Sequence, residues 1–242
     1  MQFIDSHIHL QAYNIKDTPH FIAHLHKNGA LKLVCPSVSE QDWAKVANLA
    51  DKYSQIIYPA FGIHPWYADT CSFAWQDSLR EILQKNVNAW VGESGLDRFK
   101  NQQYDIQSEV FSEHIKIAKE FSRPLIIHAV KSQQWLENFW DKLKNVRFIM
   151  HSFIGDLNFA RRVNKFGGYI SFSPSVLRYK KADDLLSDIP LDKILVESDG
   201  PYQGNAQDIP KIIELIAKTK NIDVLKVSEQ LIQNFEELSN GR

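Results

Sequence analysis

Phe3-Ile4-Asp5-Ser6-His7-Ile8-His9 opens the chain with two apolar residues that lead into an acid and a His-x-His pair. Alternate residues of a strand lie on one face, so His7 and His9 are expected to converge on one point. Two imidazoles at one point suit zinc, iron, nickel or manganese. A His-x-His pair also occurs at ordinary strand ends, so the prediction of a metal site depends on the rest of the chain.

Seven further apolar runs follow, separated by longer segments of helical period such as 39–53 and 103–121. Strands that alternate with helices are typical of a parallel sheet. The expected strands are Phe3–Ser6, Leu31–Pro36, Ile57–Gly62, Trp90–Glu93, Leu125–His128, Phe148–His151, Tyr169–Phe172 and Ile194–Val196. Eight strands in 242 residues predict an α/β fold, a TIM-type (β/α)8 barrel, with residues 1–242 forming a single domain. A doubly wound sheet is the alternative, but no glycine-rich phosphate loop follows the first strand.

The composition limits the partners of the protein. The chain has 28 Lys+Arg against 29 Asp+Glu, which excludes a strongly basic surface, so contact with nucleic acid must be local to a site. No membrane span or signal peptide is recognisable, and two cysteines, Cys35 and Cys71, are too few for a disulfide framework. We therefore expect a cytoplasmic protein without membrane contact or an obligate protein partner.

Ionisable side chains stand at the carboxyl ends of five expected strands, where barrel enzymes carry their active sites. They are His7, His9, Glu93, His128, His151 and Asp199. This set exceeds the needs of one four-coordinate ion that keeps a position open for water. Two divalent ions about 3.5–4 Å apart would use all six, and Glu93, midway round the barrel, is the natural bridge. The histidines inside expected helices are interpreted as surface or core residues: His20, His24, His26 and His114.

Short motifs are distributed over nearly the whole chain. They are Phe3-Ile4-Asp5-Ser6-His7-Ile8-His9-Leu10, Gly62-Ile63-His64-Pro65, Gly92-Glu93-Ser94-Gly95-Leu96-Asp97, Gln107 with Phe111, Pro124-Leu125-Ile126-Ile127-His128, His151-Ser152-Phe153-Ile154-Gly155 and Glu197-Ser198-Asp199-Gly200-Pro201-Tyr202. Together these motifs resemble the TatD family of metal-dependent deoxyribonucleases, within the wider group of amidohydrolase-like barrels.

The resemblance implies a divalent-metal-dependent hydrolase, a deoxyribonuclease that cuts phosphodiester bonds. Because few cations are expected near its active site, we predict an exonuclease that acts at DNA ends or on short single-stranded DNA. The resemblance also implies one ion held by His7, His9, Glu93 and Asp199, and a second held by Glu93, His128 and His151. The two ions would be Mg, Mn or Zn. Asp199, as general base for the attacking water, and Glu93, as the shared ligand, are the catalytic residues that the resemblance implies.

Residues around the mouth of the expected barrel are candidates for substrate binding. We expect His64 to donate a hydrogen bond to phosphate and Lys131 to supply a cation. Stacking of bases is expected on aromatic residues of the same loops, which are Trp66, Tyr67, Phe153 and Tyr202. The chain departs from the family pattern at Trp66, where many relatives carry His, and at Val130, where many carry a basic residue. The cations expected near the mouth are few: Arg98, Lys100, Lys131 and Arg178.

Two other functions are compatible with the motifs. The first is an amidohydrolase-type barrel that hydrolyses a C–N or ester bond in a small metabolite. Many such barrels bridge their metals with a carboxylated lysine at the end of strand four, where this chain has Glu93. The second is a barrel retained as a non-catalytic binding module, which the six intact candidate ligands argue against.

Overall fold

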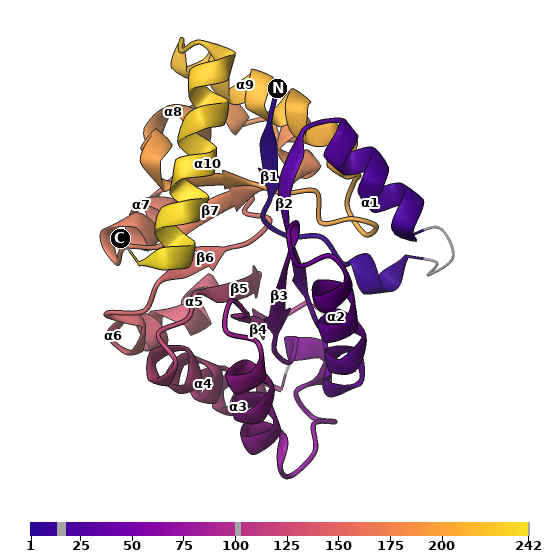
Figure 1. Cartoon of the computed structure of the whole chain (residues 1–242). Coiled ribbons are helices and arrows are strands. Elements are labelled where there is room, and N and C mark those ends of the chain that lie inside the picture. Colours follow the sequence, from indigo (N-terminus) through magenta and orange to yellow (C-terminus); the bar gives the residue numbers. More distant parts are fainter. Residues whose placement is uncertain (14–17, 100–102, 242) are drawn as a thin grey trace.

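Eight parallel strands lie side by side in sequence order, from β1 to β8 (Figure 1). This computed structural model describes residues 1–13, 18–99 and 103–241. Its strands are β1 (Phe3–Asp5), β2 (Ala30–Pro36), β3 (Ile57–Phe61), β4 (Trp90–Asp97), β5 (Leu125–Val130), β6 (Phe148–Met150), β7 (Tyr169–Phe172) and β8 (Ile194–Val196). The predicted (β/α)8 barrel is confirmed. The largest difference is in β4, which continues past Glu93 because residues up to Asp97 pair with β5.

Backbone hydrogen bonds between β1 and β8 bring the two edges of the sheet together. Ser6 N donates to Val196 O at 3.0 Å, and Asp199 N donates to His7 O at 2.9 Å. Ile8 and Gly200 form a further bridge. These bonds lie at and beyond the carboxyl ends of the strands, so the barrel is closed at the end that carries the candidate ligands.

Side chains from every strand fill the barrel interior, as expected for a packed barrel core. The strands contribute Ile4, Val34, Ala60, Trp90, Ile126, Ile149, Tyr169 and Leu195. Helix α10 (Val224–Asn240) adds Phe235, whose ring lies 5.6 Å from the ring of Trp90. Asn234 Nδ2 donates to Ile194 O, where β8 begins. Helix α10 therefore covers the amino end of the barrel and leaves the carboxyl end for a site.

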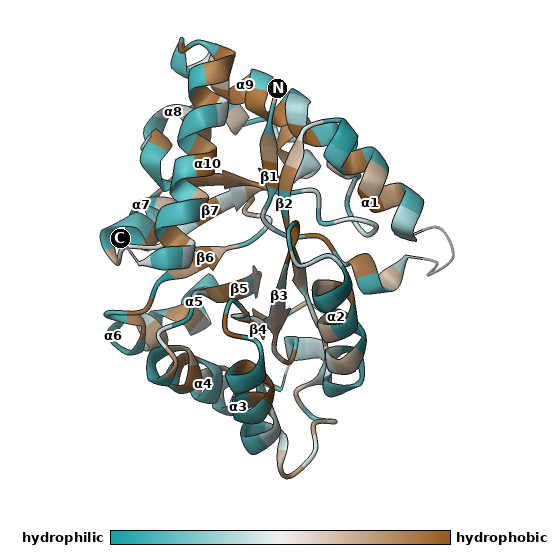
Figure 2. Ribbon diagram, in the orientation of Figure 1, coloured by the Kyte–Doolittle hydropathy of each residue, from teal (hydrophilic) through white to brown (hydrophobic). Residues whose placement is uncertain are grey.

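Helices form the outer layer and turn apolar residues toward the sheet (Figure 2). Besides α10, they are α1 (Thr18–Lys27), α2 (Glu40–Lys52), α3 (Trp75–Lys85), α4 (Tyr104–Glu120), α5 (Gln133–Leu136), α6 (Trp140–Leu143), α7 (Leu157–Lys165), α8 (Ala182–Asp188) and α9 (Ile209–Lys220). In α4, Phe111, Ile115 and Ala118 follow helical spacing and are buried. No helix among the described residues is both long and apolar enough to cross a membrane.

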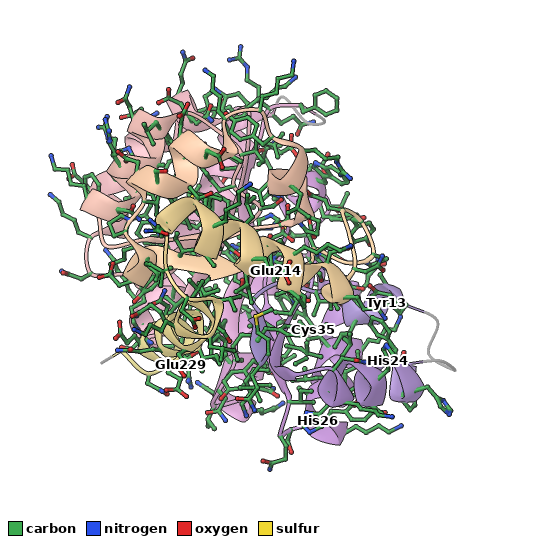
Figure 3. All side chains as sticks on the ribbon, turned by 90° about the horizontal axis from the view of Figure 1, so that it is seen from above. Tyr13, His24, His26, Cys35, Glu214 and Glu229 are labelled. Carbon is green, nitrogen blue, oxygen red and sulfur yellow. The ribbon has the colours of Figure 1, made fainter. Side chains whose placement is uncertain are left out.

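The histidines of the helices divide into exposed and buried ones. His24 and His26 are exposed on α1, at the edge of the molecule in the view from above (Figure 3). His114 on α4 is fully buried and stacks on Trp75, with 4.8 Å between the ring centres. The interpretation as surface or core residues therefore agrees with where these side chains lie.

Candidate metal centre

The six candidate ligands come from five strands and meet at the carboxyl end of the barrel. Glu93 lies in β4 and His128 in β5, whereas His151 and Asp199 follow β6 and β8. His7 and His9 lie beyond β1, which ends at Asp5 and not at the predicted Ser6. The chain nevertheless stays in register, because Ile8 N donates to Val34 O at 2.9 Å and Ile8 bridges Gly200. Both imidazoles consequently face the same point, with 3.0 Å between their Nε2 atoms.

The two carboxylate oxygens of Glu93 face different groups of histidines. Oε2 lies 3.2 Å from His7 Nε2 and 3.5 Å from His9 Nε2. Oε1 lies 2.9 Å from His128 Nδ1 and 2.8 Å from His151 Nε2. Asp199 Oδ1 lies on the first side, 3.5 Å from His9 Nε2. One carboxylate thus stands between two sets of nitrogen donors.

A glycine holds Glu93 in this position. Gly92 has φ 127°, a region that side-chain-bearing residues rarely adopt. A Cβ at Gly92 would also lie 2.9 Å from Cβ of Ile126 on β5. Only glycine fits here, so the Gly-Glu pair is a geometric requirement for aiming the carboxylate into the barrel mouth.

Three of the candidate ligand histidines use their outer ring nitrogen in a hydrogen bond. His9 Nδ1 donates to Pro36 O at 3.2 Å. His128 Nε2 donates to Asp97 Oδ2 at 3.0 Å, and His151 Nδ1 donates to Glu197 Oε1 at 3.2 Å. Such bonds hold the rings in orientation, and once the inner nitrogen has lost its proton they leave its lone pair for a cation. Sequence reasoning gave no role to Asp97 or Glu197, although both belong to the motifs that carry the family resemblance.

The charges in the site favour ionised carboxylates. Burial opposes ionisation of Glu93, but positive charge on the neighbouring histidines, above all His151, outweighs it and holds the pKa of Glu93 well below its usual range. Burial also opposes ionisation of Asp199, and the hydrogen bond from His9 together with nearby imidazole charge lowers its pKa. Both groups are anions at neutral pH, which is the form that metal ligands require.

The donor set fits divalent cations. Ligands about 2.0–2.1 Å from an ion lie about 2.8–3.4 Å from one another in octahedral or tetrahedral geometry. The atoms around Glu93 are separated by 2.8–3.5 Å, with nitrogen facing nitrogen at 3.0 Å between His7 and His9 and at 3.1 Å between His128 and His151. Neutral imidazole and carboxylate donors of this kind suit zinc, manganese and similar ions.

His64 lies beside this set but presents a different atom. Its Nδ1 accepts a hydrogen bond from Trp66 N at 3.1 Å. In the neutral imidazole the proton is then on Nε2, which faces His128 Nδ1 at 3.2 Å and Glu93 Oε1 at 3.5 Å. Burial lowers the pKa of His64 well below its ordinary value, so the ring is neutral. His64 therefore points an N–H into the site, not a lone pair.

A cavity of about 440 Å³ opens above the candidate ligands. Aromatic residues that line it and are exposed to solvent are Trp66, Tyr67, Phe99 and Tyr202. Phe153, expected to stack on bases, is only 5% exposed and packs on Phe159 in the core, so that expectation is wrong. Phe99, 69% exposed, was missed because nothing in its local sequence distinguishes it from a loop residue.

None of the described cations expected at the mouth is among the residues that line the cavity. Lys131 Nζ is 4.7 Å from the centre of the Phe99 ring, and the guanidinium of Arg98 lies 5.9 Å from the Trp135 ring. Arg178 belongs to the turn η4 (Pro174–Arg178) and does not line the cavity. Lys100 falls outside the described residues. Among the described lining residues there is neither lysine nor arginine.

A family model described as "TatD related DNase" matches residues 4–240. The chain belongs to the TatD-related DNase family. It is 29% identical to the putative deoxyribonuclease tatdn3 of Danio rerio, over 96% of this chain and 95% of that protein. It is 25% identical to the deoxyribonuclease TATDN3 of Homo sapiens, over 96% of this chain and 92% of that one.

Structural similarity agrees with the sequence comparison. The crystal structure of YjjV, a TatD homologue from Escherichia coli, aligns with a TM-score of 0.90 at 25% identity, over 98% of this chain and 97% of that one. Its sequence is described as an uncharacterized metal-dependent hydrolase. The predicted family is thus confirmed, and this TatD protein is a metal-dependent hydrolase.

Proposed function

We propose that residues 1–242 form one phosphodiesterase domain that holds two divalent ions and removes nucleotides from DNA ends. The observation that carries this proposal is the division of Glu93, with Oε2 toward His7 and His9 and Oε1 toward His128 and His151. The first ion would be held by His7, His9, Glu93 and Asp199, and the second by Glu93, His128 and His151. When bound, Mg, Mn or Zn ions would activate water and stabilise charge on the phosphoryl oxygens.

Individual side chains would have separate roles in the proposed hydrolysis. Asp199 is ionised and lines the cavity, so its carboxylate would accept the proton of the attacking water. His64 Nε2–H would donate to a non-bridging phosphate oxygen, because its tautomer is fixed by Trp66 N. Asp97 and Glu197 would hold the rings of His128 and His151 in place.

Aromatic residues and not cations would bind the nucleotide. Tyr202 lies edge-on to His9, with 5.1 Å between ring centres, and offers an exposed face for a base. Phe99 offers a second exposed ring, and Lys131 Nζ lies 4.7 Å from the centre of that ring. The deoxyribonuclease names of two relatives support DNA as the substrate. Both cysteines, Cys35 and Cys71, are free, which supports a cytoplasmic location.

The experiment compares linear, end-labelled single-stranded and duplex oligonucleotides with a covalently closed circle of the same sequence. Chelated protein should be inactive, and Mg, Mn or Zn should restore cleavage of the linear strands from their ends. Full activity in protein shown by elemental analysis to be free of metal would contradict the role of the ions. Rapid cutting of the closed circle would show an endonuclease instead.

Hydrolysis of a C–N or ester bond in a small metabolite is a second candidate. The observation in its favour is the cavity, which is largely aromatic and has no lysine or arginine among its described lining residues. A panel of small amides and esters assayed with the same metal-loaded protein separates the two functions. Turnover of an amide at least as fast as that of oligonucleotides would favour this second candidate.

A further inference from the structure

The cavity lacks a protein cation where a phosphodiester would enter. Val130 lines the cavity, and the neighbouring Lys131, which does not line it, has its Nζ 4.7 Å from the centre of the Phe99 ring. Negative charge on a substrate would be met by the ions, and any further contact to phosphate must come from uncharged donors. Apart from His64, the described lining residues with polar side chains outside the candidate ligand set include Ser152 and Gln203, which lie beside each other.

The loop after β8 holds Gln203 close to Asp199. Tyr202 N and Gln203 N both donate to Asp199 O, at 2.9 and 3.0 Å. The next residue, Gly204, packs so closely on η4 that a Cβ would lie 2.4 Å from Pro174 Cγ. The backbone around Gln203 is therefore anchored on both sides, against the general-base candidate and against the turn after β7.

Two serine hydroxyls orient the Gln203 amide. Ser152 Oγ lies 3.0 Å and Ser173 Oγ 3.1 Å from Gln203 Oε1. Both hydroxyls can donate their single proton to this oxygen, because Ser175 Oγ, 2.5 Å from Ser173 Oγ, can donate to Ser173. Ser152 follows the candidate ligand His151, and Ser173 is 1% exposed at the end of β7. A carbonyl oxygen has two lone pairs, so both acceptor positions of the amide are used. Within the described part of the chain, Gln203 Nε2 has no hydrogen-bond partner, and its residue lines the cavity.

We propose that Gln203 is a specificity-determining residue whose Nε2 donates to a non-bridging oxygen of the phosphodiester, with Ser152 and Ser173 as positioning residues. The inference rests on the proposed phosphodiesterase function. An amide with an occupied carbonyl can only donate, and phosphate oxygens can only accept, so the two match without a charge on the protein. This amide would bind a single phosphate group. Because the amide carries no charge, the binding affinity would change little with salt concentration.

The first test measures kcat and KM of the metal-loaded protein on bis(4-nitrophenyl) phosphate, which has no base to stack. Gln203→Met keeps the length of the side chain and removes the donor, so KM should rise about 10- to 100-fold, the loss expected for one hydrogen bond to a charged group. Gln203→Glu should raise it further through repulsion. Ser173→Ala should have a smaller effect in the same direction.

Gln203→Lys tests the same contact by adding a cation. At low salt this variant should have a lower KM than the parent protein. With a single-stranded oligonucleotide as substrate, log KM should also acquire a slope of about 0.7 against log salt concentration, as for one neutralised phosphate. The matched control is Gln207→Lys, which makes the same charge change at an exposed residue that is hydrogen-bonded to His24 outside the cavity. Its KM should equal that of the parent protein.

Calorimetric binding of a dithymidine with a CH2 group in place of the bridging oxygen separates this inference from the proposed function. If the parent protein cleaves no diester but Gln203→Met binds the analogue more weakly, the proposed phosphodiesterase function is wrong and the phosphate contact of Gln203 is supported. Cleavage and binding that are unchanged in Gln203→Met and Gln203→Glu would overturn the contact. An effect seen with dithymidine and not with bis(4-nitrophenyl) phosphate would overturn it too, because Gln203 would then contact the base.

Discussion

Glu93 connects the two halves of the candidate metal centre. Its oxygens lie 2.8–3.5 Å from the inner nitrogens of four ligand histidines, and its pKa is held low by their charge. No other described carboxylate reaches both groups. Asp199, by contrast, lies on the side of His7 and His9 alone. The two acids should therefore respond differently to substitution.

Glu93→Ala should lose metal from both positions, because one carboxylate serves both. Asp199→Asn should keep at least the ion near His128 and His151, while turnover falls by about 10²- to 10⁴-fold, as expected for loss of a general base. Elemental analysis and steady-state rates on the same samples test both. Glu109→Ala, on the exposed face of α4, is the control and should change neither. Two ions still bound to Glu93→Ala would rule out the bridge.

Helix α4 and the end of β3 are joined by His114. Its Nδ1 donates to Val110 O at 2.7 Å, and its Nε2 accepts from Ile63 N at 3.1 Å. Both bonds require the neutral ring, and burial lowers its pKa to about 4. Because Ile63 precedes His64, a helix residue that does not line the cavity fixes the backbone that presents the proposed phosphate donor. This is a structural role that the helical pattern alone did not reveal.

The neutral state of His114 makes stability depend on pH. The unfolded chain takes up a proton near pH 6.5 and the folded chain only near pH 4, so the free energy of unfolding falls as the pH drops through this interval. The contribution is about 3 kcal/mol. Denaturant titrations at pH 7 and pH 4 should show that the wild type loses about this much more than His114→Gln. The exposed His20→Gln is the control, and an equal loss in wild type and His114→Gln would contradict the prediction.

In the barrel as a whole, the packing around α10 and the candidate metal ligands lie at opposite ends. Its amino end is closed by α10, where Phe235 packs on Trp90 and contacts Tyr58 edge-on at 5.2 Å. The candidate ligands are at the opposite, carboxyl end, on residues that lie within β4 and β5 or follow β1, β6 and β8. The eight strands join the two ends, and the interior side chains between them are fully packed. Substitutions at the amino end should therefore lower the stability of the fold before they alter the candidate metal centre.

Phe235→Ala should lower the free energy of unfolding by about 3–5 kcal/mol, the range for removing a buried phenyl ring and leaving a cavity. The folded variant should still bind metal with wild-type stoichiometry. Urea unfolding followed by circular dichroism, together with elemental analysis below the transition, measures both. Leu225→Ala, at a residue of α10 that is 56% exposed, should change stability by no more than about 0.5 kcal/mol. A loss of metal in folded Phe235→Ala would show that the two ends are coupled.

The sequence by itself was sufficient for the barrel and for the set of candidate ligands. Runs such as Leu125-Ile126-Ile127 are apolar without alternation, which is a property of strands buried on both faces, and each is followed by helical period. In a parallel barrel every strand delivers its carboxyl end to the same face. A His or acid at the end of a run is therefore placed near the others by topology alone, before any side chain is positioned.

Only the tertiary structure decided how these residues face one another. Which oxygen of Glu93 faces which histidines, the proton position on His64 and the hydroxyl pair behind Gln203 all depend on contacts between residues far apart in the chain. The same is true of Phe153, which is buried, and Lys131, which lies against Phe99. A local pattern reports which residues a strand end carries, but rotamer and burial are set by neighbours that other strands supply.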